Sequence, residues 1–187
     1  SVSTEWREKV SLGARAMALP APVWLIGNYD ADGRPNAMAA SWASVCCSHP
    51  PCVAVAVRPE RHSHHGIAAR GAFTISVPSA AQVDAADVFG TKSGRDADKF
   101  GLAGMTAVRS ALVDAPYVAE CPVVLECRVR ETIELGSHTL FVAEVLDVKV
   151  DPGALTPAGD LDAATVDPFV LSGGAYRALG RQLPRVR

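Results

Sequence analysis

Hydrophobic and polar residues alternate most regularly along residues 123–135. On an extended chain, one face would carry the apolar side chains of Leu125, Cys127, Val129, Ile133 and Leu135. The opposite face would carry Glu126, Arg128, Arg130, Thr132 and Glu134. Alternation with a period of two is typical of a β-strand that buries one face. The pattern therefore predicts a long strand with one face in the core and the other in water.

Further apolar and β-branched stretches predict strands over residues 23–29, 36–44, 52–57, 73–77 and 138–150. The turn sequence Asp-Ala-Asp-Gly at residues 30–33 joins the first two of these strands, and Gly-Ser at residues 136–137 precedes the last. Strands outnumber helices, and adjacent strands are joined by hairpins. We therefore expect a mainly β fold with flanking helices, built as an antiparallel barrel.

Helices are predicted at four places. Residues 4–18 place Trp6 and several aliphatic residues among charged ones, with Ser3 or Thr4 available as an N-cap, which predicts a short amphipathic helix. Shorter helices are predicted over residues 67–70, 79–89 and 173–179, the second capped by Ser79. Residues 151–167 are rich in Pro, Gly, Ala and Asp, which indicates an irregular surface excursion.

Length, charge and hydropathy favour a single domain that neither binds nucleic acid nor enters a membrane. With 187 residues, 49% hydrophobic and 20% charged, we expect one domain over residues 1–187. The net charge of -2 offers no basic stripe for nucleic acid. No apolar run approaches the roughly 20 residues that span a bilayer, and no signal peptide is recognisable, so we expect a cytoplasmic protein that does not enter a membrane. The mean hydropathy of +0.15 favours a homodimer that buries apolar surface.

The cysteines do not form a recognisable redox or metal motif. They are Cys46, Cys47, Cys52, Cys121 and Cys127, without CxxC spacing, and we expect reduced, buried thiols. Neighbouring side chains on a strand point to opposite faces, so a bond between Cys46 and Cys47 would be strained. We therefore interpret both as structural.

Two other kinds of ligand site are not predicted. His62, His64 and His65 crowd the start of a helix, but no carboxylate or cysteine stands at ligand spacing, so a surface or phosphate-loop role is expected instead of a metal. A glycine-rich phosphate loop of the Rossmann or Walker type is also absent from the sequence. Nucleotide binding by a doubly wound sheet is therefore not expected.

Six separated segments carry a resemblance to a known family. They are Gly-Arg-Pro-Asn-Ala-Met-Ala-Ala-Ser-Trp at 33–42, Arg-Pro-Glu-Arg-His-Ser at 58–63, Gly-Ala-Phe-Thr-Ile-Ser-Val at 71–77, Ser-Gly-Arg-Asp-Ala-Asp-Lys-Phe at 93–100, Gly-Ser-His-Thr-Leu-Phe-Val at 136–142, and Pro-Phe-Val followed by Gly-Gly-Ala-Tyr within 168–176. In this order they resemble the flavin-reductase-like family of FMN-binding split barrels, including the flavoredoxin type. The resemblance implies an antiparallel split β-barrel that binds FMN.

The resemblance implies a phosphate site made of Arg58, Ser63, Ser93, Arg95 and Lys99. Guanidinium groups and hydroxyls at the start of a helix are suited to a phosphate. Taken without the resemblance, the same residues would be a solvated charged loop.

The flavin edge is assigned to small and apolar residues, namely Asn36, Met38, Ala40, Ser41, Trp42, Ala43 and Ser44. Small residues let the backbone approach the ring, and Met38 and Trp42 can cover its apolar faces; the alternative is an ordinary core strand. His138 either positions the electron donor or merely begins a strand. Tyr176 either anchors the last helix or reaches the FMN of a partner subunit.

The function that the resemblance implies is an FMN-dependent oxidoreductase. NADH or NADPH would deliver a hydride to flavin N5, and the reduced flavin would pass electrons to a protein, an oxygenase or free flavin. Ser137 stands where many reductase relatives carry Asp before the histidine. A flavoredoxin-like electron-transfer protein without nicotinamide oxidase activity is therefore the alternative, and a flavin-free barrel is a third.

Overall fold

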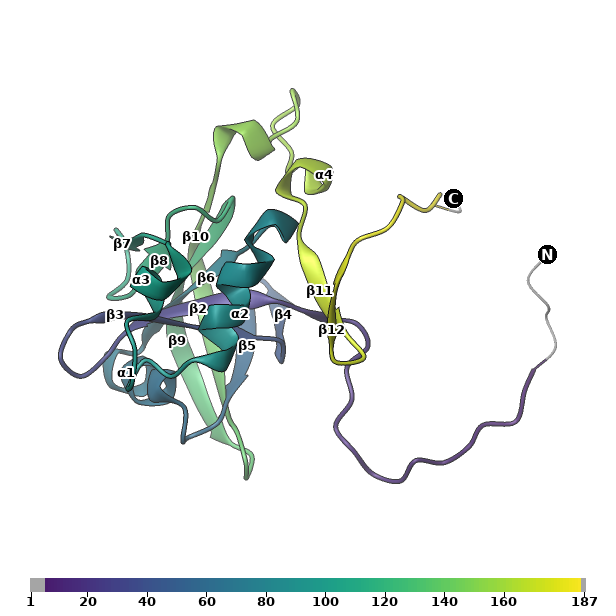
Figure 1. Cartoon of the computed structure of the whole chain (residues 1–187), viewed down its shortest axis with the longest axis horizontal. Coiled ribbons are helices and arrows are strands. Elements are labelled where there is room, and N and C mark those ends of the chain that lie inside the picture. The colour runs from purple at the N-terminus through teal and green to yellow at the C-terminus, as the bar shows by residue number, and fades with distance from the viewer. Residues whose placement is uncertain (1–5, 186–187) are drawn as a thin grey trace.

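The body of the protein is built around a seven-stranded antiparallel sheet. The computed structural model describes residues 6–185. The strands follow the order β3-β2-β6-β9-β10-β5-β4 (Figure 1). Their bounds are Trp24–Tyr29 for β2, Pro35–Ala40 for β3, Ala43–Ser48 for β4, Pro51–Val57 for β5, Ala72–Val77 for β6, Val123–Glu134 for β9 and Thr139–Val150 for β10.

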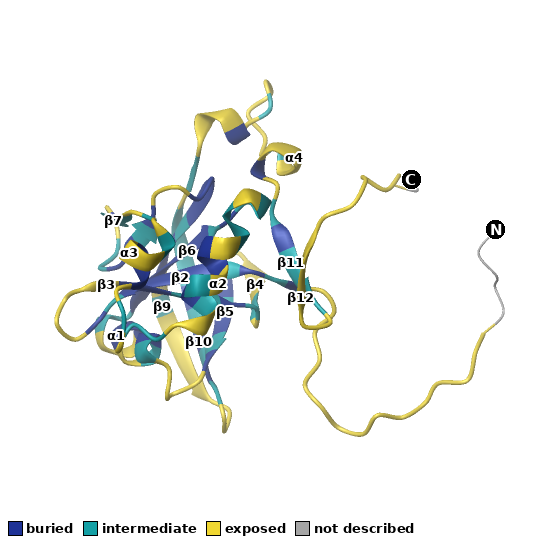
Figure 2. Ribbon diagram, in the orientation of Figure 1, coloured by how far each residue is buried: buried dark blue, intermediate teal, exposed yellow. Residues whose placement is uncertain are grey.

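The sheet curls around a core but does not close. Its edge strands β3 and β4 follow one another in the chain, yet they do not pair. Apolar side chains from strands across the sheet, among them Ile26, Val55, Phe73 and Phe141, fill one interior cluster, and Figure 2 shows buried residues concentrated in the strands. The expected mainly β fold and antiparallel split barrel are confirmed.

The β9–β10 hairpin confirms the long alternating strand but corrects its two faces. Thr139 pairs with Glu134, and Leu135 N–H donates to the His138 carbonyl at 3.0 Å. Glu126, expected in water, is fully buried. Ile133 and Leu135, expected in the core, are exposed, because this end of the hairpin extends beyond the neighbouring strand β6, which pairs only with Val123 to Arg128.

Glu126 is buried because the fold supplies it with partners from other segments. Its carboxylate accepts hydrogen bonds from Ala111 N–H at 3.1 Å and Leu112 N–H at 3.0 Å, and from Lys149 Nζ at 2.7 Å. Buried carboxylates are tolerated when they are paired in this way. None of these partners can be identified from the alternation of residues 123–135.

Helices cover one side of the barrel. They are α1 (His62–Arg70), the 3-10 turn η1 (Ala80–Gln82), α2 (Val83–Thr91) and α3 (Lys99–Ala103). Phe89 of α2 and Phe100 of α3 meet edge to face, with ring centroids 5.1 Å apart, in a second apolar cluster. Ser79 is the N-cap of η1, and its N–H donates to Gln82 Oε1 at 2.9 Å, so the predicted helical segment and its cap are confirmed.

The smaller elements complete the fold. A three-stranded sheet consists of β1 (Ala21–Pro22), β11 (Phe169–Ser172) and β12 (Ala175–Ala178), and β7 (Ala107–Arg109) pairs with β8 (Pro116–Val118). The stretch 151–167 is irregular as expected apart from the single turns η2 (Pro152–Ala154) and α4 (Ala163–Val166). No helix among residues 6–185 is long and apolar enough to cross a membrane.

Two predicted helices are wrong. Residues 6–18 contain no helix and run away from the body (Figure 1), while residues 4 and 5 lie outside the described part. An isolated helix of about 15 residues is marginal unless its apolar face is packed, and here Trp6 is 86% exposed. Residues 173–179 form a hairpin strand instead, because Gly173 and Gly174 adopt φ of 61° and 77° and turn β11 back into β12.

Two boundaries and the exposure of two cysteines also differ from the prediction. The single strand expected over residues 36–44 is broken at Ser41 and Trp42, where the chain passes from one sheet edge to the other. Helix α1 begins at His62, earlier than the predicted 67. The thiols are free, but Cys46 and Cys47 are exposed, so the expectation of buried cysteines holds only for Cys52, Cys121 and Cys127.

Candidate functional site

A pocket of about 590 Å³ lies between the start of α1, the end of α2 and strand β3. We call it the basic pocket, because four cationic side chains line it, accompanied by one acid. Those residues are Arg58, Arg61, Lys92, Lys99 and Glu60. Two hydroxyls, from Ser63 and Ser93, also line it. On a chain with a net charge of -2, this concentration of positive charge favours an anionic ligand.

Helix α1 points its N-terminus at this pocket. Its N-cap, Arg61, makes no side-chain capping bond, and the first turn carries no acidic residue. Arg61, His62 and Ser63 all line the pocket. The first backbone N–H groups of a helix have no partner within the helix and carry partial positive charge. The local sequence therefore adds a dipole to the side-chain cations.

Lys99 is the buried cation of the pocket. It is the first residue of α3, only 5% exposed, and its Nζ donates to the Phe89 carbonyl at 3.2 Å. Burial, and secondarily the charge of Arg61, lower the pKa of Lys99 to about 8. Protonated Lys99 is therefore stabilised by any anion that enters the pocket.

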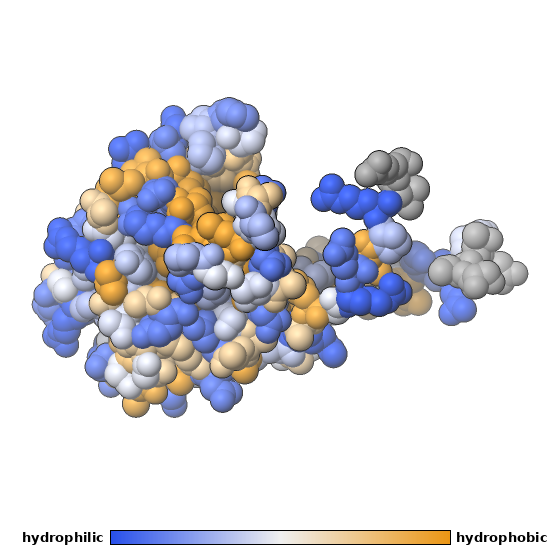
Figure 3. All heavy atoms as spheres, turned by 90° about the horizontal axis from the view of Figure 1, so that it is seen from above, coloured by the Kyte–Doolittle hydropathy of each residue, from blue (hydrophilic) through white to orange (hydrophobic). Residues whose placement is uncertain are grey.

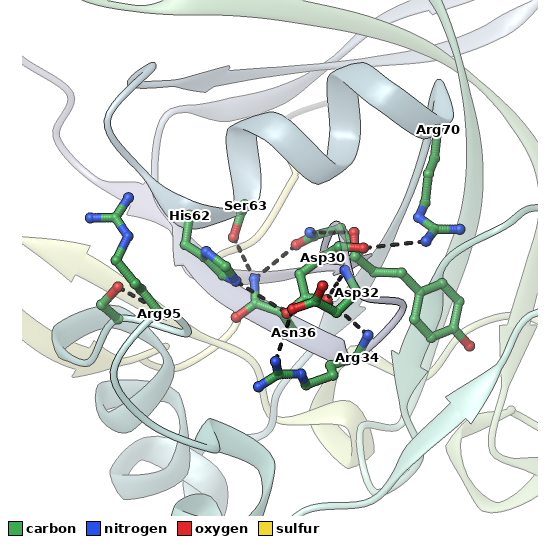
Figure 4. A network of polar contacts seen from close by, with 11 residues as sticks. Asp30, Asp32, Arg34, Asn36, His62, Ser63, Arg70 and Arg95 are labelled. Carbon is green, nitrogen blue, oxygen red and sulfur yellow. Dashed lines mark hydrogen bonds and ion pairs between the residues drawn. The ribbon is translucent and has the colours of Figure 1, made fainter.

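A polar network supports the floor of the pocket beneath α1 (Figure 4). Asn36 Nδ2 donates to Asn28 Oδ1 at 3.0 Å and to Ser63 Oγ at 2.8 Å. Asn36 Oδ1 and His62 Nε2 are buried without a hydrogen bond, and His62 Nε2 lies 3.5 Å from Asp30 Oδ2. Burial alone would raise the pKa of Asp30, but hydrogen bonds from the Arg34 and Asp32 backbone lower it, so the carboxylate stays charged.

Gly94 allows a loop to approach this network closely. A Cβ at this position would overlap Asn36 Oδ1 and lie 2.8 Å from His62 Cδ2. The loop that carries Ser93 can therefore meet the floor of the pocket only with glycine at residue 94.

A second, smaller cavity of about 240 Å³ continues from the basic pocket. We call it the Trp42 pocket. Both cavities share Met38, Ala39, Arg58 and Arg61, so together they form one groove. The remaining lining residues of the Trp42 pocket are Ala40, Ser41, Trp42, Ala56 and His138. The Trp42 and His138 rings are 4.8 Å apart between centroids, with planes inclined by 34°.

The groove brings together most of the residues predicted from the sequence. Arg58, Ser63, Ser93 and Lys99 line its basic end, and Met38 lies where the two cavities meet. At the other end, Ala40, Ser41, Trp42 and His138 surround the Trp42 pocket, while Asn36 lies beneath the basic pocket through Ser63.

Four predicted residues lie elsewhere. Arg95 is exposed and lines a neighbouring cavity with Asn36. Ala43 and Ser44 line a third cavity, together with part of the N-terminal segment. Tyr176 Oη donates to Asp87 Oδ1 at 3.1 Å, and its ring packs edge to face against Phe169.

Sequence reasoning missed Arg61 and Lys92 as lining residues. Arg61 stands inside the 58–63 segment that carries the resemblance, so the signal was present, but only the helix geometry shows that it faces the pocket. Lys92 precedes Ser93 with no motif of its own. The neighbouring histidines lie in three different surroundings. His62 lines the pocket, His64 forms a hydrogen bond with Thr139, and His65 is exposed.

Comparison with known proteins places the chain in a family. A model of the flavin reductase like domain matches residues 16–180. The chain belongs to the flavin reductase like family. The similarity that the six segments indicated is thereby confirmed.

Solved structures of this family superpose closely on the chain. Flavoredoxin of Desulfovibrio vulgaris (Miyazaki F) is 46% identical, with a TM-score of 0.89 over 95% of this chain and 97% of that one. Flavoredoxin from Methanosarcina acetivorans is 30% identical, with a TM-score of 0.88 over 96% of this chain and 95% of that one. Both likenesses cover the β-barrel and the helices that flank the groove.

A curated relative from Rhodococcus opacus is the reductase component of 4-nitrophenol 4-monooxygenase/4-nitrocatechol 2-monooxygenase. It is 31% identical over 122 residues, which are 65% of this chain and 62% of that protein. The first three curated relatives are uncharacterised proteins, and the chain spans 65, 63 and 52% of their lengths.

Proposed function

We propose that the groove binds FMN, with the phosphate in the basic pocket and the flavin ring in the Trp42 pocket. The observation that carries this proposal is the buried ammonium of Lys99 beside Arg58 and Arg61, opposite two hydroxyls and an uncapped helix N-terminus. A dianionic phosphate needs cations and hydrogen-bond donors together.

The other end of the groove matches an aromatic ring system. Met38 and Trp42 offer apolar surface, and Ala39, Ala40 and Ser41 between them have side chains small enough for the ring edge to approach the backbone. The groove thus changes from cationic to apolar along its length. FMN has the same polarity, with a charged phosphate at one end and an extended ring at the other.

The reaction that we propose is reduction by NADH or NADPH followed by electron transfer to an oxygenase or another acceptor. Bound FMN would supply hydride acceptance at N5 and onward electron transfer. His138 and Trp42 would hold the donor against the ring, while Arg58 and Lys99 would hold the phosphate. The Rhodococcus opacus relative, a reductase component of a monooxygenase, supports this direction of electron flow.

A second candidate is an electron carrier that does not oxidise nicotinamide. It is favoured by the 46% identity to a flavoredoxin over nearly the full length of both chains. Ser137, whose Oγ lies 2.9 Å from His138 Nδ1, stands where the resemblance to reductases implies an acid. An acid at that position would place a negative charge beside the imidazole, and a serine brings no charge.

We further propose a homodimer. The extended segment before β1 exposes Trp6 and Val10 at 86% each, and the C-terminal segment exposes Leu183. Figure 3 shows apolar residues reaching the surface of the body as well as the extended part. A second subunit would cover such surface and could bring Tyr176 close to the flavin of its partner.

Anaerobic stopped-flow reduction of the FMN-loaded chain tests the function. Rapid bleaching of flavin absorbance by NADH or NADPH supports the reductase. No reduction by either nucleotide, with full and reversible reduction by dithionite, supports the electron carrier. A chain that retains no FMN at micromolar concentration contradicts both proposals.

A further inference from the structure

Three of the five cysteines, Cys46, Cys47 and Cys52, lie close together in the β4–β5 hairpin, at one edge of the main sheet. The register of this antiparallel pair shifts between Val45 and Cys47: Val45 pairs with Val53, whereas Cys47 pairs with Cys52. Two residues of β4, Cys46 and Cys47, therefore stand opposite the single residue Cys52 of β5. This two-against-one arrangement is a β-bulge. The regular alternation that underlies the expectation for Cys46 and Cys47 is therefore interrupted at this point of β4.

The register places Cys47 and Cys52 within reach of a disulfide. Directly paired residues of an antiparallel ladder have Cα atoms about 4.5–5.5 Å apart and side chains on the same face. Disulfides span Cα separations of about 4.4–6.8 Å. A pair in this register therefore falls within the range of Cα separations that a disulfide spans.

Exposure separates the three thiols into different roles. Cys46 and Cys47 are exposed on an edge strand, whereas Cys52 is 5% exposed. Although Cys46 is exposed, partial desolvation and the nearby Cys52 and Cys47 raise its pKa, which indicates that the three thiols are close together. Cys47 is both exposed and directly paired with Cys52 in the ladder, so Cys47 is the thiol that meets a reagent in solution and Cys52 is the thiol that can react with it next.

We propose that Cys47 and Cys52 form a dithiol that exchanges with low-molecular-weight disulfides. The Cys47 thiolate attacks one sulfur of the reagent, its disulfide bond breaks, and one small thiolate leaves. The Cys52 thiolate then attacks Cys47 Sγ and expels the second small thiolate. Two protein thiols thereby lose two electrons and two protons, and the reagent disulfide becomes two thiols.

The other two cysteines, Cys121 and Cys127, serve as internal controls for thiol oxidation. Cys121 and Cys127 are buried, and burial raises the pKa of each to about 12. Both are therefore expected to stay reduced while the hairpin reacts. None of Cys46, Cys47 and Cys52 lines the proposed flavin groove, so the test does not require bound FMN.

The experiment treats the reduced full-length chain with oxidised glutathione, unfolds it in N-ethylmaleimide, and counts alkylated thiols by intact mass. We expect three alkylated thiols instead of five, no retained glutathione, and full recovery after dithiothreitol. Cys46→Ser is the matched control, because Cys46 is an exposed cysteine of the same strand. This variant should still form the bond between Cys47 and Cys52. In Cys47→Ser no internal bond should form, and in Cys52→Ser a glutathione adduct should persist.

Three results would overturn the proposal. They are a wild-type chain that keeps five alkylatable thiols or a stable glutathione adduct, an internal bond that survives in Cys47→Ser, and loss of the bond in Cys46→Ser. Because Cys47 is exposed, Cys47→Ser keeps the test decisive even if Cys52→Ser does not fold.

Discussion

Replacing Lys99 by methionine should stabilise the flavin-free protein at neutral pH while weakening its proposed phosphate site. Lys99 is 5% exposed, and burial is the first cause that lowers its pKa from 10.5 to about 8. Methionine has a similar length without a charge. The substitution therefore removes the cost of holding an ammonium group in a buried place.

The size of the effect follows from the pKa. Each pKa unit corresponds to about 1.4 kcal/mol, so the lowered value costs the folded state ~3 kcal/mol at pH 7. Losing the hydrogen bond to the Phe89 carbonyl offsets ~1 kcal/mol of that gain. We expect Lys99→Met to raise the free energy of unfolding by ~2 kcal/mol at pH 7.

The gain should disappear at higher pH. Between pH 8 and 10.5 the unfolded chain binds a proton at Lys99 that the folded chain has released, so wild-type stability from this group rises with pH. The Lys99→Met variant has no such group. The difference between the two proteins should therefore be largest below pH 8 and should nearly vanish by about pH 9.5.

Urea unfolding of the flavin-free proteins at pH 7, 8.5 and 9.5 measures both effects. Lys92→Met is the matched control, because Lys92 lines the same pocket but is exposed, and should change stability by no more than ~0.5 kcal/mol. A Lys99→Met protein less stable than wild type at pH 7, or a difference that does not change with pH, would refute the reasoning.

Three further predictions follow from the groove and the exposed segments. His138→Ala should leave the FMN affinity within about threefold of wild type but slow flavin reduction by the nicotinamide nucleotide at least tenfold, since positioning of the two reactants contributes several kcal/mol. An unchanged stopped-flow rate would mean that His138 only begins a strand. Gly94→Ala should lower stability by ~1–3 kcal/mol because its Cβ would overlap Asn36 Oδ1, whereas Gly153→Ala, with nothing within 4 Å, should not; equal unfolding midpoints would contradict the close approach. Light scattering should give twice the monomer mass at micromolar concentration, and a monomer with bound flavin would exclude the dimer.

The strands were accessible from sequence because their signals are local. Alternation along residues 123–135, the glycine after Leu135 and the cap at Ser79 each act within a few residues. They correctly predicted the strand, the turn and the helix start, although not which face of the strand is buried along its whole length. Gly173 and Gly174 also form a local turn signal, which joins β11 to β12. The prediction of a helix over residues 173–179 was therefore wrong.

The features that could not be predicted from the sequence depend on contacts between residues far apart in the chain. Glu126 looks like a solvent-facing residue until residues 111, 112 and 149 fold around it. The same holds for the site: Arg58, Ser63 and Lys99 were grouped only through the resemblance, and Arg61 needed the helix start to face the pocket. A one-residue register shift places Cys52 opposite Cys46 and Cys47, and nothing within β4 encodes it.

The central claim, that the basic pocket holds a flavin phosphate, is tested most directly by titrating FMN and riboflavin into the flavin-free chain and following flavin fluorescence. The double variant Arg58→Ala, Lys99→Ala removes two cations from the pocket, and Arg128→Ala is a control arginine on β9 outside the groove. With each charge-assisted contact worth about 1.5–3 kcal/mol, the double variant should bind FMN at least a hundredfold more weakly. Riboflavin, which lacks the phosphate, should bind the double variant and wild type within about threefold. Equal losses for both ligands, or an FMN affinity that is unchanged, would contradict the claim.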